Sequence, residues 1–386
     1  MKILHSADWH IGNFPGPEQE GKNLRALDTV KCIRNLHNTA QRELPDVILI
    51  AGDLFHQARV WADRGLSEVN TAIEAIEELS QICPVIVMRG TPNHDGSEQF
   101  EMLRARFSKT NTNVYIITEP RGIRITIDDG KVAAICMLPG FDKGVYRAKL
   151  PGLSKEEENI VFTEELGKAI SALKAANYDA DINIFMSHYT VPGCNLESGQ
   201  TQFFSQFEPV ILPEVLDAAG FDLVCLGHIH RPQKLESCRN TFYSGAINAT
   251  SFNDESQERG FWIHELEASL PYDKLVDSRF ITSPIREFMT LRMDDDAIQA
   301  FNNSGAFIYG AETTGGIKDK IVRVIYSCTD ETNKAFNRAL MEKRLYDEGA
   351  FWVSEISPEQ ITISTNKNEL SDVSNRIERP RVAQNK

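Results

Sequence analysis

The chain has 386 residues, of which 41% are hydrophobic and 25% charged, and its formal net charge is −14. This composition is typical of a folded protein with a sizeable core, and it excludes collagen-like, fibrous and largely disordered classes. Such an acidic chain does not bind nucleic acid through bulk charge, although a local basic groove or bound divalent cations can still hold phosphate.

The chain also lacks the features of membrane and secreted proteins. No apolar run approaches the roughly 18 residues of a membrane span, and no signal peptide follows Met1. The seven cysteines include no C-x-x-C pair, so we expect reduced interior thiols without disulfides or structural zinc. We therefore expect a cytoplasmic protein with no membrane association.

The first two thirds of the chain alternate strand-length apolar runs with amphipathic helices. The predicted strands are 2–4, 47–51, 85–88, 132–136, 182–186 and 223–226, and the predicted helices are 24–43, 61–82 and 154–177. This order predicts an α/β fold in which helices pack against a sheet. Short alternating strands between residues 239 and 265 indicate a second sheet that completes this unit.

A smaller α+β unit is predicted after a linker at residues 272–284. Its predicted strands are 286–293, 320–328 and 351–356, and its predicted helices are 294–303 and 332–346. The polar tail that follows carries Leu370, Val373 and Ile377 at the spacing of one face of a short helix. Such a helix can dock on a partner or pack on its own domain.

Side chains of the types that can bind a metal ion follow shortly after five of the predicted strands. Six of the nine histidines lie in these segments, a concentration that packing alone does not explain. The segments hold Asp8 and His10, then Asp53 and His56, then Asn93, His94 and Asp95, then His188, and finally His228 and His230. Because ligands bind beyond the carboxyl ends of the strands in an open α/β sheet, these side chains are expected to meet.

The residue types predict a centre for two divalent ions. Carboxylates, an amide and imidazoles form a mixed oxygen and nitrogen set suited to Mn²⁺, Fe²⁺ or Zn²⁺. Asp53 is the best candidate to bridge two ions, and two ions would leave the site positive beside the charges of Asp8 and Asp53. Each motif alone has a simpler explanation, such as a turn for Gly-Asp or a core histidine for His188. The five motifs together favour the metal centre.

These motifs resemble the calcineurin-like metallophosphoesterases, and among them the SbcD-type nucleases of double-strand-break repair. The resemblance rests on KILHSADWH at residues 2–10, GDLFH at 52–56, the Asn93-His94-Asp95 motif, His188 and GHIHRPQ at 227–233. It implies a two-sheet sandwich flanked by helices, with a small α+β capping domain. The implied units are a nuclease domain at 1–275, a DNA-capping domain at 285–362 and a C-terminal tail at 363–386 that can form a partner-docking helix.

The resemblance also implies a role for each site residue. One Mn²⁺ ion would be held by Asp8, His10, Asp53 and His230, and the other by Asp53, Asn93, His188 and His228. The three remaining residues are implied to be catalytic: His94 would stabilise the transition state and protonate the leaving 3′ oxygen, Asp95 would orient His94, and His56 would place the DNA strand.

The implied activity is Mn²⁺-dependent hydrolysis of DNA as an exonuclease, an endonuclease or both. The implied partners are DNA, an SbcC-type coiled-coil ATPase and a second copy of the chain. Candidate phosphate contacts are Arg59, Arg64, Arg89, Arg104, Arg106, Arg231 and Lys234. Two alternatives are a phosphodiesterase or phosphatase for a small substrate and a non-catalytic scaffold. The appended unit argues against the first, and the complete ligand set argues against the second.

One motif departs from the family pattern. Family members usually carry Gly-Asn-His followed by Asp or Glu, whereas Thr91 and Pro92 stand here between Gly90 and Asn93. The turn is therefore expected to differ, while Asn93 and His94 are expected to keep their places as usual.

Overall fold

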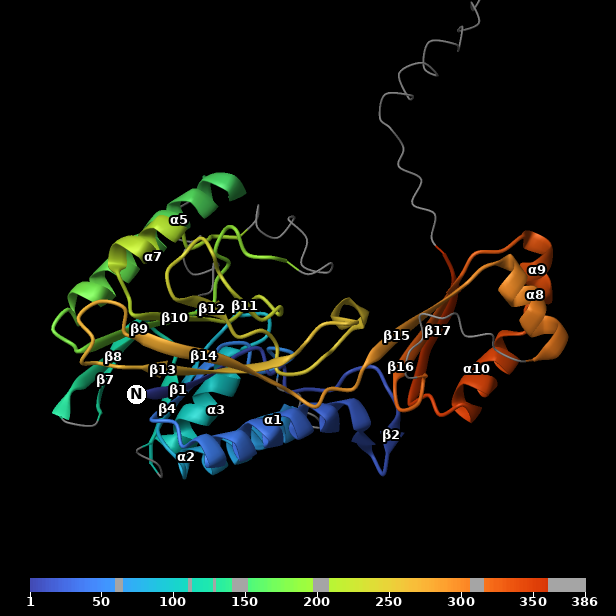
Figure 1. Ribbon diagram of the computed structural model, residues 1–386, viewed down its shortest axis with the longest axis horizontal. Helices are drawn as coiled ribbons and strands as arrows, with labels where there is room; N and C mark the ends of the chain where they lie inside the picture. The colour runs from blue at the N-terminus through green and yellow to red at the C-terminus, as the bar shows by residue number, and fades with distance from the viewer. Residues whose placement is uncertain are drawn as a thin grey trace, which may run out of the picture.

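Two six-stranded sheets lie face to face between two layers of helices in the larger part of the computed structural model (Figure 1). The structure describes residues 1–59, 65–109, 113–127, 130–140, 152–196, 208–305 and 316–359. The first sheet has the order β14-β13-β1-β4-β5-β6 and the second the order β11-β12-β10-β9-β8-β7. The predicted α/β fold built on two sheets is confirmed.

The first sheet is parallel at its centre. Its strands are β1 (Lys2–Ser6), β4 (Val47–Ala51), β5 (Val85–Met88) and β6 (Val114–Ile117), followed by the antiparallel β13 (Gly260–Leu266) and β14 (Leu275–Thr282). The strands of the second are β7 (Arg121–Thr126), β8 (Val132–Leu138), β9 (Ile182–Ser187), β10 (Leu223–Leu226), β11 (Gln233–Lys234) and β12 (Thr241–Tyr243). In both sheets the central parallel strands end at one edge.

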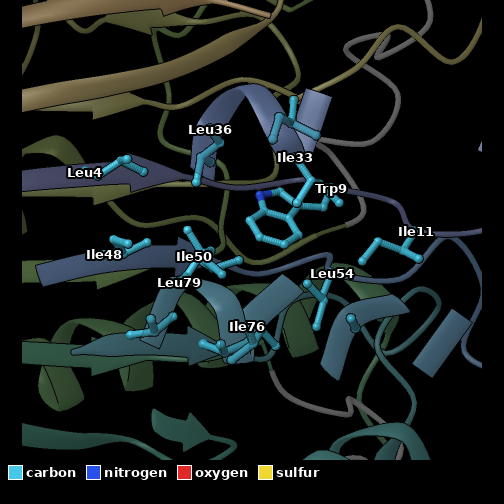
Figure 2. Close-up of a cluster of buried hydrophobic side chains, with 14 of the residues drawn as sticks. Leu4, Trp9, Ile11, Ile33, Leu36, Ile48, Ile50, Leu54, Ile76 and Leu79 are labelled. Atoms are coloured by element: carbon cyan, nitrogen blue, oxygen red, sulfur yellow. The ribbon is translucent and has the colours of Figure 1, made fainter. Parts of the chain in front are cut away.

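Alternating side chains of the central strands enter two different cores. Val47 and Leu49 pack between the sheets, whereas Ile48 and Ile50 pack against helices. Figure 2 shows the second of these cores, where Ile48 and Ile50 meet side chains of α1 and α2. A strand that is buried on both faces needs an unbroken apolar run, which is why the sequence predicts these strands well.

Helices cover both outer faces. The first sheet is covered by α1 (Leu24–Glu43), α2 (Gly65–Ser80) and α3 (Ser97–Phe107), and the second by α5 (Lys155–Ala175) and α7 (Pro213–Ala219). Asn23 caps α1 by accepting the Ala26 N–H, and Ser154 forms a capping box with Glu157 at the start of α5. Short elements complete this part, namely β2 (Glu18–Gln19), β3 (Lys22–Asn23) and the 3₁₀ turn Phe252–Asp254.

The smaller part is a parallel three-stranded sheet with helices on one side. It contains β15 (Phe288–Met293), α8 (Asp295–Ser304), β16 (Ile321–Tyr326), α9 (Asp330–Ala335), α10 (Arg338–Asp347) and β17 (Trp352–Pro358). The prediction of a single helix at 332–346 is wrong. The backbone is extended at Phe336, and a second helix, α10, begins after its N-cap Asn337. The packing of Phe336 into the core of this part accounts for the break.

The segment between residues 239 and 265 does not form a sheet of its own, so that prediction needs correction. Its first strand, β12, joins the second sheet beside β10, and its last strand, β13, pairs with β1 in the first sheet. The predicted linker also holds a strand, because β14 pairs along β13. Four of its eight residues are polar and none of its side chains is buried, so a search for apolar runs missed this strand. The division of the chain into domains stays a prediction.

Two further sequence predictions concern the termini and membranes. Leu370, Val373 and Ile377 of the predicted docking helix lie outside the described residues. Within the described ranges, no helix is both long enough and apolar enough to cross a bilayer. All seven cysteines are free thiols, five of them buried.

Candidate metal centre

The loops that follow β1 and β4 run side by side and bring their polar residues together. The N–H of Asp8 donates to the Gly52 carbonyl at 2.9 Å, and the N–H of His10 donates to the Asp53 carbonyl at 3.1 Å. The N–H of His228, after β10, donates to both Asp8 carboxylate oxygens at 3.0 and 3.2 Å. These hydrogen bonds therefore hold three of the five predicted segments against one another.

The side chains between the predicted ligands anchor these loops in the core. Trp9 is fully buried, and its indole N–H donates to Ser6 Oγ at 2.8 Å. Figure 2 shows Trp9 and Leu54 inside the core between the first sheet and its helices. The burial of Trp9 anchors the loop from which Asp8 and His10 reach the site.

Four predicted ligands have a strained backbone. Asp8, His10, Asp53 and His228 have φ angles of 50°, 46°, 49° and 91°. Residues with side chains rarely adopt positive φ, and in folded proteins such strain gathers at functional sites. The strand ends thus turn sharply, and the surrounding hydrogen bonds hold them there.

Two glycines make room for His188 at the end of β9. A Cβ on Gly52 would lie 2.3 Å from the Nδ1 atom of His188, and a Cβ on Gly227 would lie 2.7 Å from it. The same Nδ1 lies 2.6 Å from the Ala51 carbonyl, to which it donates. This bond places the proton on Nδ1 and leaves Nε2 available as a metal ligand.

The first cluster contains Asp8, His10 and His230. Their ligand atoms all lie within 4.8 Å of one another. The two Nε2 atoms of the histidines are 3.0 Å apart, and each lies farther from Asp8 Oδ1, at 4.0 Å for His10 and 3.9 Å for His230. Convergent imidazole nitrogens beside a buried carboxylate are the donors that a transition-metal ion needs.

The second cluster contains Asp53, His188 and His228. Their ligand atoms also lie within 4.8 Å of one another, and His188 Nε2 is 3.2 Å from Asp53 Oδ2. His188 Nε2 is also 3.9 Å from Asp8 Oδ1, so the two clusters adjoin. Sequence reasoning missed Glu208, whose Oε2 lies 3.2 Å from His228 Nε2. No strand end or motif marks Glu208 in the sequence.

The charges of the site favour bound cations. Burial raises the pKa of Asp8. Burial also opposes ionisation of Asp53, yet the facing His188 holds the pKa of that carboxyl well below its usual range. Burial disfavours charge on His188 as well, but Asp53 and Asp8 raise its pKa to about 10. A proton on His188 thus compensates the buried carboxylates, and a divalent ion would replace it.

The residues fit two divalent ions. The donors are two carboxylates and four imidazoles in two adjoining clusters, and His10 keeps a buried Nδ1 atom without a hydrogen-bond partner among the described residues. Burial, together with the neighbouring His230, lowers the pKa of His10 well below its usual value. This imidazole is therefore neutral, which is the form that binds a metal ion.

The histidines predicted to be catalytic line the same site. His94, His10 and His56 present nitrogen atoms within 4.8 Å of one another. His94 Nδ1 lies 2.6 Å from the His56 carbonyl and donates to it. Burial and the charge of His94 lower the pKa of His56 to about 4, so His56 is neutral at physiological pH.

Asp95 lies beneath the site. Its carboxylate accepts the N–H of Gly90 at 2.7 Å and that of Phe55 at 3.1 Å. Burial and the charge of Asp53 raise the pKa of Asp95 to about 7. Asp95 therefore joins the loops that carry Gly90 and Phe55. His94 is oriented by the His56 carbonyl, to which its Nδ1 donates.

Asn93 is placed differently from the other predicted ligands. Its side chain is exposed, whereas Asp8, His10, Asp53 and His188 are buried. Thr91 takes the position beside Asp53 instead, because its N–H and its hydroxyl lie 2.6 and 2.9 Å from Asp53 Oδ1. The ligand role of Asn93 stays a prediction.

The family model for calcineurin-like phosphoesterases matches residues 1–232, the range that contains every residue of both clusters. The chain belongs to the calcineurin-like phosphoesterase family. Members of this family use divalent metal ions, in agreement with the two clusters.

Two relatives narrow the likeness within the calcineurin-like phosphoesterases. The SbcD component of the SbcCD nuclease from Staphylococcus epidermidis is 25% identical over 335 residues, which cover 84% of this chain and 82% of that protein. Its counterpart in Staphylococcus saprophyticus is 27% identical over 309 residues, 78% of this chain and 74% of that protein. The predicted resemblance to SbcD-type proteins is confirmed.

Among solved structures, a dimetal phosphatase from Danio rerio aligns with this chain with a TM-score of 0.43 and 12% sequence identity. The alignment covers 73% of this chain and 99% of that chain.

Proposed function

We propose that this protein is a Mn²⁺-dependent nuclease that hydrolyses phosphodiester bonds of DNA. The observation that carries the proposal is the convergence of six predicted ligands from separate strand ends in two adjoining clusters. The two relatives, both named as components of a nuclease, support DNA as the substrate. The mixed donor set supports Mn²⁺ but also suits Fe²⁺ or Zn²⁺.

In this proposal Asp53 would contribute to both metal sites. Asp8, His10, Asp53 and His230 would hold one ion, and Asp53, His188, His228 and an oxygen from the turn at residues 91–93 would hold the other. Two such ions would attract the scissile phosphate, supply hydroxide near neutral pH and stabilise charge on the phosphoryl oxygens.

The surrounding residues act on the substrate. With its Nδ1 proton committed to the His56 carbonyl, His94 has its Nε2 free to hold a proton for the leaving 3′ oxygen. Neutral His56 packs on Phe14, with ring centroids 4.3 Å apart, and is suited to place a DNA strand. Asp95 acts through the loops that it joins and is a positioning residue.

Duplex DNA needs cations close to its phosphates. Arg59 and Arg231 are exposed and follow predicted site residues closely, so we propose them as phosphate contacts. We do not propose Arg104 and Arg106 as phosphate contacts, because they form ion pairs with Glu101 and Glu77. Arg64 lies outside the described residues.

We also propose partners and a location. The names of the relatives support a complex with an SbcC-type ATPase, and we place a dimer of this chain on DNA in the cytoplasm. Deleting residues 366–386 should abolish copurification with an SbcC-type ATPase while sparing nuclease activity. Undiminished binding would place the docking surface elsewhere.

The deciding experiment compares three substrates. Purified protein with Mn²⁺ is incubated with linear duplex DNA, single-stranded DNA and a small generic phosphodiester, with the His188→Ala variant as a control for contaminating nucleases. We expect DNA to be degraded by the wild type only. Turnover of the small phosphodiester without DNA degradation would favour a small-substrate phosphodiesterase, and no turnover at all would favour a scaffold.

A further inference from the structure

The turn after β5 carries an unusual residue next to the centre of the site. Thr91 donates two hydrogen bonds to the same carboxylate oxygen, Asp53 Oδ1, from its N–H at 2.6 Å and from its hydroxyl at 2.9 Å. Asp53 Oδ2 faces His188 Nε2 at 3.2 Å. The Thr91 hydroxyl therefore lies beside the carboxylate of the second cluster.

The backbone holds Thr91 in this position. A Cβ on Gly90 would lie 2.3 Å from both the N and the Oδ1 atoms of Asp53, so only glycine lets the two strand ends approach so closely. The Thr91 carbonyl accepts the N–H groups of His94 at 3.1 Å and of Asp95 at 2.8 Å. Thr91 is thus fixed from both sides.

The same turn carries Asn93 away from the carboxylate. The chain reverses between Thr91 and His94, and the Asn93 side chain is exposed. The Asn93 carbonyl is occupied by the N–H of Ala58 at 3.1 Å, which holds the backbone of the turn. The two residues added between Gly90 and Asn93 therefore move Asn93 outward and put Thr91 directly after the glycine.

We propose that the Thr91 hydroxyl, and not the Asn93 amide, is the oxygen ligand that joins Asp53, His188 and His228 at the second ion. The inference rests on the proposed metal-dependent function and names a residue of that same site. A hydroxyl has one proton and two lone pairs, so it can donate to Asp53 Oδ1 and still offer a lone pair to a cation. Threonine and serine hydroxyls bind divalent ions in this way in P-loops.

The hydroxyl also preserves the charge of the site. Threonine and asparagine are both neutral ligands, so the exchange leaves the balance between the ions and the carboxylates of Asp8 and Asp53 unchanged. The exposed position of Asn93 then leaves it free to face substrate or solvent.

Calorimetric titration of Mn²⁺ separates the two candidates. Thr91→Val removes only the hydroxyl and keeps both shape and backbone N–H, so it should weaken one of two ions by at least ~10-fold, whereas Thr91→Ser should restore binding. Asn93→Ala should bind two ions like the wild type. Melting of the metal-free variants checks that each is folded.

A cysteine in place of each residue distinguishes a ligand from a residue that only orients Asp53. Cd²⁺ binds thiolates strongly, so Thr91→Cys should show cadmium–thiolate absorption above the background of the wild type, and Asn93→Cys should not. Unchanged Mn²⁺ binding in Thr91→Val, or thiolate absorption in Asn93→Cys alone, would overturn the assignment. A wild type that binds no ion would instead defeat the proposed function itself.

Discussion

His94 is the residue for which binding and chemistry can be separated most cleanly. Its ring is held by the His56 carbonyl and it belongs to neither proposed ligand set. We expect His94→Gln to keep Mn²⁺ and DNA affinity but to lower turnover by about 10²-fold, the usual scale for a positioned acid. His37→Gln on α1, outside the site, is the matched control. Near-normal turnover in the His94 variant would disprove the role.

A second group of histidines lies between the sheets and has a structural explanation. His5, Cys225 and His264 cluster closely enough to hold a metal ion. However, His5 Nε2 is 3.1 Å from the Leu226 carbonyl, His264 Nε2 is 3.5 Å from His5 Nδ1, and His264 Nδ1 is 2.8 Å from Ser278 Oγ. Each ring nitrogen has a partner, so this cluster is a satisfied hydrogen-bond chain.

These two histidines should make stability depend on pH. Burial lowers the pKa of His5 to about 3 and that of His264 well below its usual value. Below about pH 6.5 the unfolded chain binds protons that the folded chain does not, so the free energy of unfolding falls as pH decreases towards 3. Each histidine contributes up to about 1.4 kcal/mol per pH unit.

Denaturant unfolding at several pH values between 7 and 4 measures this slope. In His264→Phe, where Trp262 and Phe242 already surround the ring, the slope should decrease by the contribution of about one proton. Identical slopes in the variant and the wild type would refute a neutral, buried His264.

At the scale of elements, Arg286 ties α1 to the smaller part of the molecule. Its guanidinium donates to both oxygens of Asp28 at 2.9 and 3.0 Å and to Asp319 at 2.6 Å, and it lies 3.5 Å from the centroid of the Phe351 ring. Beneath it, Phe288 and Ile321 pack on Ala249 of the larger part. These contacts join the small sheet to the larger part of the molecule, which carries the candidate metal centre.

Removing Arg286 should loosen this junction. We expect Arg286→Ala to lower the free energy of unfolding by about 1–3 kcal/mol, because Asp28 loses a charged, mostly buried partner. Degradation of duplex DNA should decrease more than turnover of a small phosphodiester. The control is Arg292→Ala, whose pair with Glu359 is exposed on both sides, with an effect within about 0.5 kcal/mol. Equal losses on both substrates would argue against a DNA-positioning role for the small unit.

For the whole molecule, the metal ions should stabilise the fold. Each ion that binds only the folded state adds about 2.7 kcal/mol when free Mn²⁺ is about 100 times its dissociation constant. Differential scanning calorimetry should show the melting temperature rising with Mn²⁺ and returning after chelation, while the circular dichroism of the folded protein persists. His188→Ala should bind one ion and show a smaller rise. A melting temperature indifferent to Mn²⁺ would contradict a two-metal centre.

The sequence determined the central strands and most candidate ligands. Strands β4, β5 and β10 lie where the apolar runs predicted them, since burial on both faces demands such runs. The motifs after them predicted that the candidate ligands meet, because parallel strands end at one edge. Both inferences use local pattern alone.

Tertiary structure decided what depends on contacts between distant segments. It assigned β12 and β13 to different sheets, placed Glu208 beside His228, and set Thr91 against Asp53. Backbone pairing and close approach between segments far apart in the chain leave no periodic signal in the residues themselves. In the turn after Gly90 the sequence carries the Asn93-His94-Asp95 motif. In the fold, however, Thr91 and not Asn93 meets the Asp53 carboxylate.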